Sequence, residues 1–290
     1  MQGTTPRRRF RQLLDDDAPI FAPLCLDALT ARIAAACGFG AGYVSGGALG
    51  YAMAVSEALL TLTEVALVTQ QVVRRSDLPI IVDAGVGFGD AVHGARTIWE
   101  IEATGAAAIE IEDQVAPKRV SHHRGIEHLV PCATMTAKIE QAALARRDPD
   151  FLIIARTGAI KNESFDAAVE RARAYRSAGA DLIMLMPTDE AQWQRASALI
   201  DAPLATIAAL DSRSAAQWRE WGWRLIIDPF TAQVLSVQAI RRAYEQFQAT
   251  GSTGHQPREL FDMYRELPAL AGLEALYRIE DQTTERGEEK

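Results

Sequence analysis

Short apolar runs alternate with longer amphipathic stretches along most of the chain. The apolar runs are continuous and do not alternate with polar residues, which is typical of parallel strands covered by helices. The amphipathic stretches between them have helical spacing, and Gly105, Gly179 and Gly222 stand just beyond three of their ends. We predict strands at residues 20–24, 42–45, 79–83, 107–112, 151–156, 182–186, 203–207 and 224–228. We predict helices at residues 28–37, 63–73, 91–103, 134–147, 165–178, 190–200 and 214–221, and one more that ends at Phe247.

Successive strand–helix units of this kind favour a closed (β/α)8 barrel, the TIM barrel, over an open doubly wound sheet. We therefore predict one barrel domain over residues 1–248. Residues 249–255 read as a linker because they are rich in Gly, Ser and Thr. The remaining segment, 249–290 with this linker, is predicted to be helical over residues 257–280. Its leucines and aromatic residues need a surface to pack on, either on this barrel or on a neighbouring subunit.

The amino-acid composition excludes several classes of protein. The 290 residues include 30 basic and 38 acidic side chains, a net charge of −8, and 48% are hydrophobic. These proportions exclude global disorder and argue against a nucleic-acid partner, which needs a basic surface. No apolar run is long enough to span a membrane, and no apolar signal segment follows the basic N-terminus. We therefore predict no membrane partner. The three cysteines have no paired spacing, which indicates a reducing compartment, so we predict a cytoplasmic protein.

Charged and glycine residues stand where the predicted strands end. Asp83, Glu112, Arg156 and Asp228 each end a strand, and Ser45–Gly47 follows another. The active sites of such barrels lie at the carboxyl ends of the strands, so we expect these groups to converge. Carboxylates on different strands can hold a hard divalent cation, and an arginine offers two parallel donors to a carboxylate. The set suits an anionic substrate whose reaction develops enolate charge beside a metal.

Four stretches of the chain resemble the isocitrate lyase/phosphoenolpyruvate mutase superfamily. They are Tyr43–Gly47, Leu78–Gly89, Ile109–Arg119 and Asp148–Thr157, and shorter similarities at 27–32, 179–181, 222–229 and 279–285 extend the resemblance over nearly the whole chain. The resemblance implies a (β/α)8 barrel whose final helix is exchanged with a neighbouring subunit, in a homo-oligomer that is a dimer or a tetramer. It also implies small 2-oxo or 2-hydroxy acid substrates, and C–C or C–P bonds formed or broken through a metal-bound enolate.

The resemblance also gives roles to individual residues. It implies Mg²⁺, with Mn²⁺ also compatible, held by Asp83 and Glu112. It implies substrate binding by Tyr43, Ser45, Gly46, Gly47 and Arg156, and catalytic roles for Arg156, Lys118 and His122. A purely structural alternative stays open for each group. The carboxylates could cap loop N–H groups, Arg156 could pair with one of them, Ser45–Gly47 could be a tight turn, and the loop side chains could be solvated.

Several positions depart from the family pattern. The usual Asp-Ala-Asp reads Asp83–Gly85, and the usual Pro-Asp pair reads Val55-Ser56, with Glu57 next to it as a candidate substitute. Val120 replaces the loop cysteine that donates a proton in the lyase branch, and a valine cannot transfer a proton. Further departures stand at other strand ends: Met186 for glutamate, Thr206 for asparagine, Gly158 for aspartate, and Asp228 as an added carboxylate. Such changes fit either a changed substrate or lost catalysis.

We predict a Mg²⁺-dependent lyase or decarboxylase that acts on a small 2-oxo or 2-hydroxy (di)carboxylic acid through an enolate. Three alternatives remain: a non-catalytic member that binds a different small ligand, an enzyme of C–P bonds in phosphonates, and an aldol-type transferase. Convergence of Asp83, Glu112 and Arg156 around space for a metal would favour catalysis. A pocket filled by Met186 would favour the non-catalytic alternative.

Overall fold

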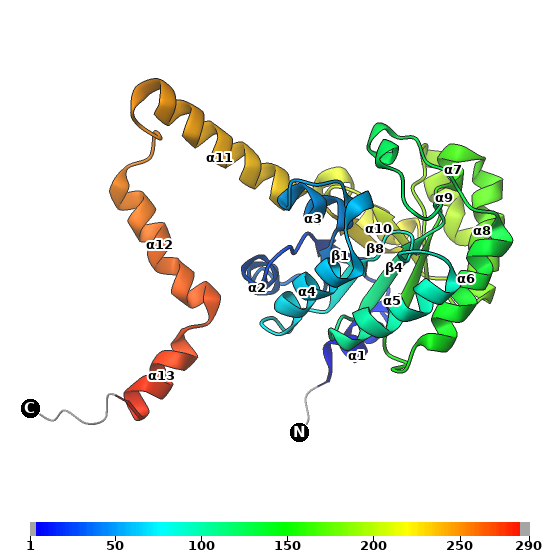
Figure 1. The fold of residues 1–290 in the computed structure, drawn as a ribbon, viewed down its shortest axis with the longest axis horizontal. Coiled ribbons are helices and arrows are strands. Elements are labelled where there is room, and N and C mark those ends of the chain that lie inside the picture. Colours follow the sequence, from blue (N-terminus) through cyan, green and yellow to red (C-terminus); the bar gives the residue numbers. More distant parts are fainter. Residues whose placement is uncertain (1–3, 285–290) are drawn as a thin grey trace, which may run out of the picture. The chain divides into compact units, whose positions relative to one another are not determined.

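Eight parallel strands form a nearly closed barrel in this computed structural model, which describes residues 4–284 (Figure 1). The sheet order is β1-β8-β7-β6-β5-β4-β3-β2. A bridge between Leu24 and Tyr43 brings β1 and β2 together at the remaining seam. The strands are β1 Ile20–Pro23, β2 Gly42–Val44, β3 Ile80–Asp83, β4 Ala108–Glu112, β5 Leu152–Arg156, β6 Leu182–Met184, β7 Leu204–Ile207 and β8 Trp223–Asp228. The predicted (β/α)8 fold is confirmed.

Helices surround the barrel and alternate with its strands (Figure 1). The residues just before several helices explain where those helices start. Asp27, Thr61 and Ser214 each accept a hydrogen bond from the backbone N–H of the third helical residue. The larger helices are α2 Ala28–Ala36, α4 Leu62–Val73, α5 Ala91–Ala103, α6 Cys132–Ala145, α8 Phe165–Ser177 and α9 Glu190–Leu199. The shorter elements are α3 Gly46–Ala52, α7 Ala159–Asn162, α10 Ala215–Glu220 and the 3₁₀ helices η1 Glu57–Leu59, η2 Val120–Arg124 and η3 Leu210–Ser212.

The helix α1, Pro6–Asp15, was not predicted from the sequence. It begins at a Thr5 cap, and Phe10 is fully buried among the apolar side chains inside the barrel. Arg7 pairs with Asp148 at a distance of 2.7 Å, on the segment that leads into β5. The helix therefore covers the end of the barrel where the strands begin. The opposite end, where the strands finish, carries the charged residues described below.

The chain divides into two compact units, Met1–Ala232 and Gln233–Lys290. The second unit contains most of α11, Thr231–Thr250, followed by α12, Pro257–Ala271, and α13, Glu274–Gln282. The helical segment predicted over residues 257–280 consists of two helices, because Gly272 takes a left-handed conformation (φ 76°) that ends α12. Residues 285–290 of the predicted C-terminal segment lie outside the described residues.

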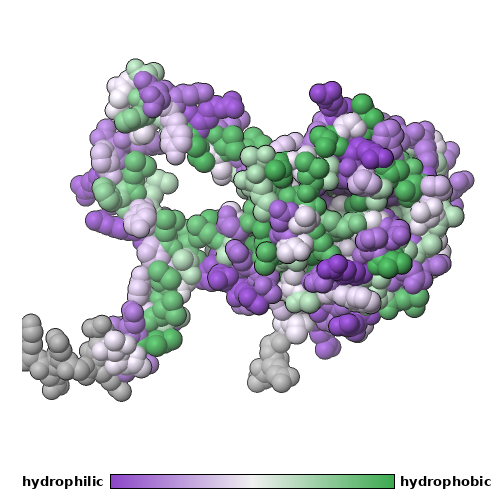
Figure 2. All heavy atoms as spheres, in the orientation of Figure 1, coloured by the Kyte–Doolittle hydropathy of each residue, from purple (hydrophilic) through white to green (hydrophobic). Residues whose placement is uncertain are grey.

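Large apolar side chains are exposed on the helices of the second unit (Figure 2). They include Leu260, Phe261, Met263 and Tyr264 on α12, and Leu276, Tyr277 and Ile279 on α13. Burial of such side chains against a second surface stabilises a protein by about 1.5–3 kcal/mol each. Within residues 4–284, no helix is both long and apolar enough to cross a bilayer.

Candidate active site

Three of the predicted site residues end adjacent strands of the barrel. Asp83 ends β3, Glu112 ends β4 and Arg156 ends β5. The register of β4 with β5 places Glu112 directly beside Arg156, and the Arg156 Nε atom lies 3.6 Å from Glu112 Oε2. The strands thus bring these three groups to one end of the barrel.

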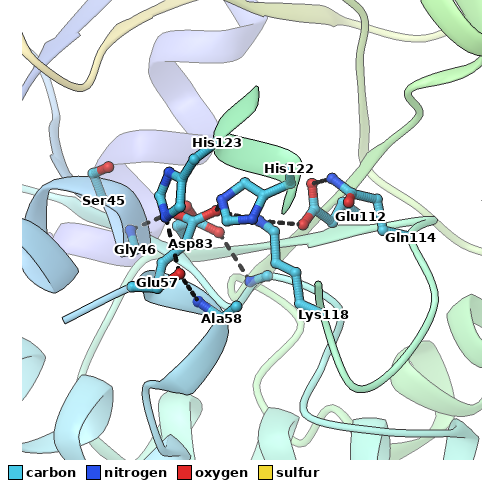
Figure 3. Close-up of polar contacts among 12 residues, drawn as sticks. Ser45, Gly46, Glu57, Ala58, Asp83, Glu112, Gln114, Lys118, His122 and His123 are labelled. Atoms are coloured by element: carbon cyan, nitrogen blue, oxygen red, sulfur yellow. Dashed lines mark hydrogen bonds and ion pairs between the residues drawn. The ribbon is translucent and has the colours of Figure 1, made fainter. Parts of the chain in front are cut away.

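Lys118 lies between two carboxylates at this end (Figure 3). Its ammonium pairs with Glu57 of η1 and lies 2.6 Å from Oε1 of Glu112. The Lys118 side chain is 8% exposed, so both ion pairs are shielded from water. The charges of Glu112 and Glu57 hold the pKa of Lys118 above its usual range, although burial alone would lower it. Lys118 is therefore charged, and it neutralises two carboxylates that would otherwise repel each other.

His122 is protonated on both ring nitrogens in this arrangement. Its Nε2 atom lies 2.6 Å from Glu57 Oε1, and its Nδ1 atom lies 2.6 Å from the carbonyl oxygen of Arg119. Both partners only accept hydrogen bonds, so each nitrogen must donate. The hydrogen bond to Glu57 raises the pKa of His122, in agreement with a charged ring. For Glu57, burial opposes ionisation, but the contacts from His122 and Lys118 outweigh it and lower the pKa to about 2.

Asp83 is buried and accepts two backbone hydrogen bonds. Gly46 N–H donates to Oδ2 at 3.0 Å, and Gly85 N–H donates to Oδ1 at 2.9 Å. Burial, together with the negative charge of Glu57, nevertheless raises the pKa of Asp83. A carboxylate that is costly to ionise here would be stabilised by an added positive charge. The Gly46 hydrogen bond also means that part of the predicted Ser45–Gly47 cradle is already used by the protein.

Glu110 is a buried charged residue of this end of the barrel that the sequence analysis missed. It lies two residues before Glu112 on the same face of β4. Its carboxylate accepts a 2.6 Å hydrogen bond from the Tyr43 hydroxyl and a 3.0 Å hydrogen bond from Arg156. Burial, with the charge of Asp83, raises the pKa of Glu110 to about 7. A glutamate inside an apolar strand was the signal that could have revealed it, since unpaired carboxylates are rarely buried.

Arg156 joins the two glutamates of β4. It donates to Glu110 and pairs with Glu112, and their charges hold its pKa well above the usual range in spite of burial. In turn, the positive charges of Arg156 and Lys118 lower the pKa of Glu112, although burial alone would raise it. The structural alternative for Arg156, an ion pair with Glu112, is therefore present in this structure. It leaves the guanidinium at the strand ends, where a substrate carboxylate could compete for it.

The remaining predicted residues lie at the edge of this cluster. Ser45 caps α3 by accepting from Ala48 N–H, and a side chain at Gly47 would meet Glu57 at 3.1 Å. Tyr43 is buried beneath the cluster, with its hydroxyl on Glu110. His123 bonds to Ser56 at 2.9 Å and to Tyr51 at 3.2 Å.

Two residues that the sequence singled out do not join the cluster. Asp228 accepts from the N–H groups of Leu210, Phe230 and Thr231, and therefore caps the start of α11. Val120 is 52% exposed on η2.

A cavity of about 210 Å³ opens beside Asp83 and Lys118. Its wall runs from α3 and η1 to the loop after β3 and to Pro117 on the loop after β4. Met186 does not fill it, and packs instead with the apolar side chains inside the barrel. Glu57, Asp83 and Lys118 therefore border open space.

The residues present fit a Mg²⁺ ion. Each Asp83 oxygen accepts a single backbone N–H, and the buried Oε1 of Glu112 faces the Lys118 ammonium at 2.6 Å. Mg²⁺ is usually held by one or two carboxylates together with water and substrate oxygens, so Asp83 and Glu112 suffice. Among residues 4–284, no three potential ligands are close enough to form an all-protein site. Lys118 would have to move for a dication to reach Glu112.

The chain is similar to known proteins over nearly its whole length. Residues 10–248 match the family described as phosphoenolpyruvate phosphomutase. A 2-methylisocitrate lyase from Aeropyrum pernix is 37% identical over 248 residues, which cover 83% of this chain and 80% of that protein. An oxaloacetate decarboxylase from Paraburkholderia xenovorans is 36% identical over 209 residues, which cover 71% and 70%. The solved structure of a phosphonopyruvate hydrolase with oxalate and Mg²⁺ has a TM-score of 0.85 and 26% identity, covering 97% of this chain and 100% of that one.

Proposed function

Since the chain belongs to the phosphoenolpyruvate mutase/isocitrate lyase superfamily, and its relatives include a 2-methylisocitrate lyase and an oxaloacetate decarboxylase, we propose that it is a Mg²⁺-dependent lyase or decarboxylase. Its substrate would be a small 2-oxo or 2-hydroxy (di)carboxylic acid. The observation that carries this proposal is the convergence of Asp83, Glu112, Arg156 and Lys118 at the ends of the strands, where Asp83 and Lys118 line an open cavity. A cluster kept only for structure would not need charged groups around open space.

The proposed reaction breaks one C–C bond and leaves its electron pair on the carbon that becomes an enolate. In the decarboxylase version, CO₂ leaves carbon 3 of a 2-oxo acid and a proton then adds to that carbon. In the lyase version, a 2-hydroxyl loses its proton as the bond breaks and becomes a 2-oxo group. When bound, Mg²⁺ supplies charge that stabilises the negative oxygen. Asp83 and Glu112 would hold it.

The chain's own residues would bind the substrate and handle the proton. Arg156 offers a planar pair of donors to a substrate carboxylate, and the Gly47 N–H and the Ser45 hydroxyl stand at the start of α3. The lyase-branch cysteine is absent, but Lys118 and His122 are both protonated and lie on the loop that borders the cavity. Both can therefore deliver a proton from the same loop, at Nζ or at Nε2.

We also propose that the chain forms a homo-oligomer, a dimer or a tetramer. The exposed apolar side chains of α12 and α13 support this, because a second copy would remove them from water.

The proposed activity is tested with a panel of 2-oxo and 2-hydroxy acids, incubated with Mg²⁺ and followed by proton NMR for the cleavage products. Oxaloacetate and 2-alkylmalates represent the two versions of the reaction. We expect cleavage of at least one acid by the wild-type protein. We expect loss of that cleavage in Arg156→Lys, because lysine cannot form the bidentate contact with the substrate carboxylate. Absence of cleavage across the panel, with the fold intact, would overturn the proposal.

A further inference from the structure

The cavity beside Asp83 is polar at one end and apolar along the rest of its wall. The polar end is formed by Glu57, Asp83 and Lys118, with Gly46 between them. The apolar wall is formed by Ala58, Leu60, Val65, Val86, Phe88 and Pro117. A wall of this kind gives a polar group no partner, and an unpartnered polar group is costly to bury. The geometry of the cavity therefore separates the place for charge from a place for hydrocarbon.

Open space at Gly85 belongs to this cavity. A Cβ atom added at Gly85 would have no heavy atom within 4 Å, although the residue lines the cavity. Gly85 has φ +50° and its N–H is bound to Asp83, so the turn that positions Asp83 also leaves this side of the cavity empty. A residue with any side chain would fill part of the space next to the carboxylate.

Phe88 forms part of the apolar wall from a strained backbone. It has φ +58°, a conformation that bulky L residues rarely adopt and that costs about 1–2 kcal/mol. The strain is maintained where the aromatic ring packs against the core and lines the cavity. The wall is thus a fixed feature of the turn after β3.

The volume sets the size of the occupant. An apolar cavity of about 150 Å³ in another protein binds benzene, so about 210 Å³ accommodates a group of about four to six carbons beside the charged end. Mg²⁺ and a substrate carboxylate would occupy the polar end, which leaves the apolar end for a substituent of the same molecule.

We propose that this cavity binds an alkyl substituent of about four to six carbons on the substrate, so that the enzyme selects branched or long-chain 2-oxo or 2-hydroxy acids over unsubstituted ones. This inference rests on the proposed function, since it assumes that the acid group binds at Asp83, Glu112 and Arg156. The residues that set the specificity are Ala58, Leu60, Val65 and Phe88, with Gly85 providing the space.

The test is calorimetric titration of oxalate, oxamate and a series of N-alkyl oxamates into the full-length protein with Mg²⁺. Oxamate keeps the planar acid core of oxalate, and the alkyl group on its nitrogen extends from the position of carbon 3 of an enolate. We expect the Kd to fall about three- to fourfold per added methylene up to butyl or pentyl, and then to rise. The binding heat capacity should become more negative along the same series.

Two matched variants locate the effect. Ala58→Leu adds three carbons inside the cavity, so the optimum chain should become shorter by about three carbons. Ala103→Leu makes the same change at an exposed position at the end of α5, and should leave the whole series unchanged.

The outcomes separate the two proposals. Oxalate binding with a flat dependence on chain length, or a dependence that Ala58→Leu does not move, would overturn the alkyl pocket and leave the proposed function standing. Failure of oxalate and of every oxamate to bind would overturn both. A chain-length optimum that Ala58→Leu alone shortens would support the pocket.

Discussion

His122 donates to Glu57 through Nε2 and to the Arg119 carbonyl through Nδ1, each over 2.6 Å. The bond to Glu57 ties the loop after β4 to η1, 65 residues earlier in the chain, and the bond to Arg119 fixes the ring within the loop itself. Lys118 makes a second contact from the same loop to the same glutamate. Glu57 therefore holds the loop in place over the cavity, and release of that loop would free both protonated side chains.

We expect Glu57→Gln to lower the pKa of His122. The glutamate hydrogen bond is the main cause of the raised value, and a neutral amide cannot stabilise the imidazolium to the same extent. Histidine NMR titration of the wild type and the variant measures this directly. Ser56→Ala is the matched control, because it removes the neighbouring contact of His123 and leaves Glu57 in place. An unchanged His122 titration in Glu57→Gln would contradict the assignment.

Glu110 should make stability fall as the pH rises towards neutrality. The folded chain keeps this proton up to about pH 7, whereas the unfolded chain releases it near 4.5, so folding binds a proton between these values. The stabilisation is complete below pH 4.5 and is lost as the pH rises through 7. Its size is roughly 3 kcal/mol from the size of the shift. The Glu110→Gln variant has no carboxyl group at this position, so its stability lacks this pH dependence.

Urea unfolding of the wild type and of Glu110→Gln at several pH values measures the difference. We expect the stability of the wild type relative to the variant to decrease between pH 5 and 8. Tyr43→Phe should move this change to higher pH, because the tyrosine hydroxyl stabilises the ionised form of Glu110. A constant difference between wild type and Glu110→Gln would show that Glu110 is ionised throughout.

Asp228→Ala should reduce stability without affecting the site. The carboxylate caps α11 through backbone N–H groups, and removal of such a cap costs about 1–2 kcal/mol. Oxalate affinity should be unchanged, since Asp228 is bonded to the backbone and to Thr231. Thermal unfolding measures the stability, and calorimetry measures the oxalate affinity. A loss of oxalate affinity without a loss of stability would show that Asp228 contributes to the site.

The oligomer is tested by sedimentation velocity of the full-length protein. We expect a dimer or a tetramer, and dissociation on placing aspartates at Phe261 and Tyr264, which are both exposed on α12. The paired substitution Phe261→Asp and Tyr264→Asp should leave the circular dichroism of the barrel unchanged. A wild-type protein that sediments as a monomer at micromolar concentration would contradict the exchanged-helix prediction.

The strands could be predicted because helices cover them, so each is an uninterrupted apolar run. Ile80–Asp83 and Leu152–Arg156 end on the charged residues that the sequence indicated. Helix α1 could not be recognised so easily, since three arginines in succession obscure its apolar face, which is anchored by Phe10. The break at Gly272 was missed because glycine also occurs within helical patterns.

The site was predicted in part. The ends of the strands indicate which charges converge, but not how they pair. The contact of Glu57 with both Lys118 and His122 joins two loops whose approach is set by tertiary packing. Glu110 was missed because its neighbours Ile109 and Ile111 are typical of a buried core strand. That Glu110 faces the inside of the barrel beneath Glu112 is visible only in the folded structure.

Asp83, Glu112 and Arg156 are proposed to form a Mg²⁺-dependent site for the enolate of a small acid. Titration of oxalate, a planar mimic of that enolate, into the purified protein with Mg²⁺ and then with EDTA tests it most directly. We expect oxalate to bind with Mg²⁺, EDTA to abolish this binding, and Asp83→Asn to weaken it at least tenfold. Absence of binding in both conditions, or equal binding in both, would contradict this proposal.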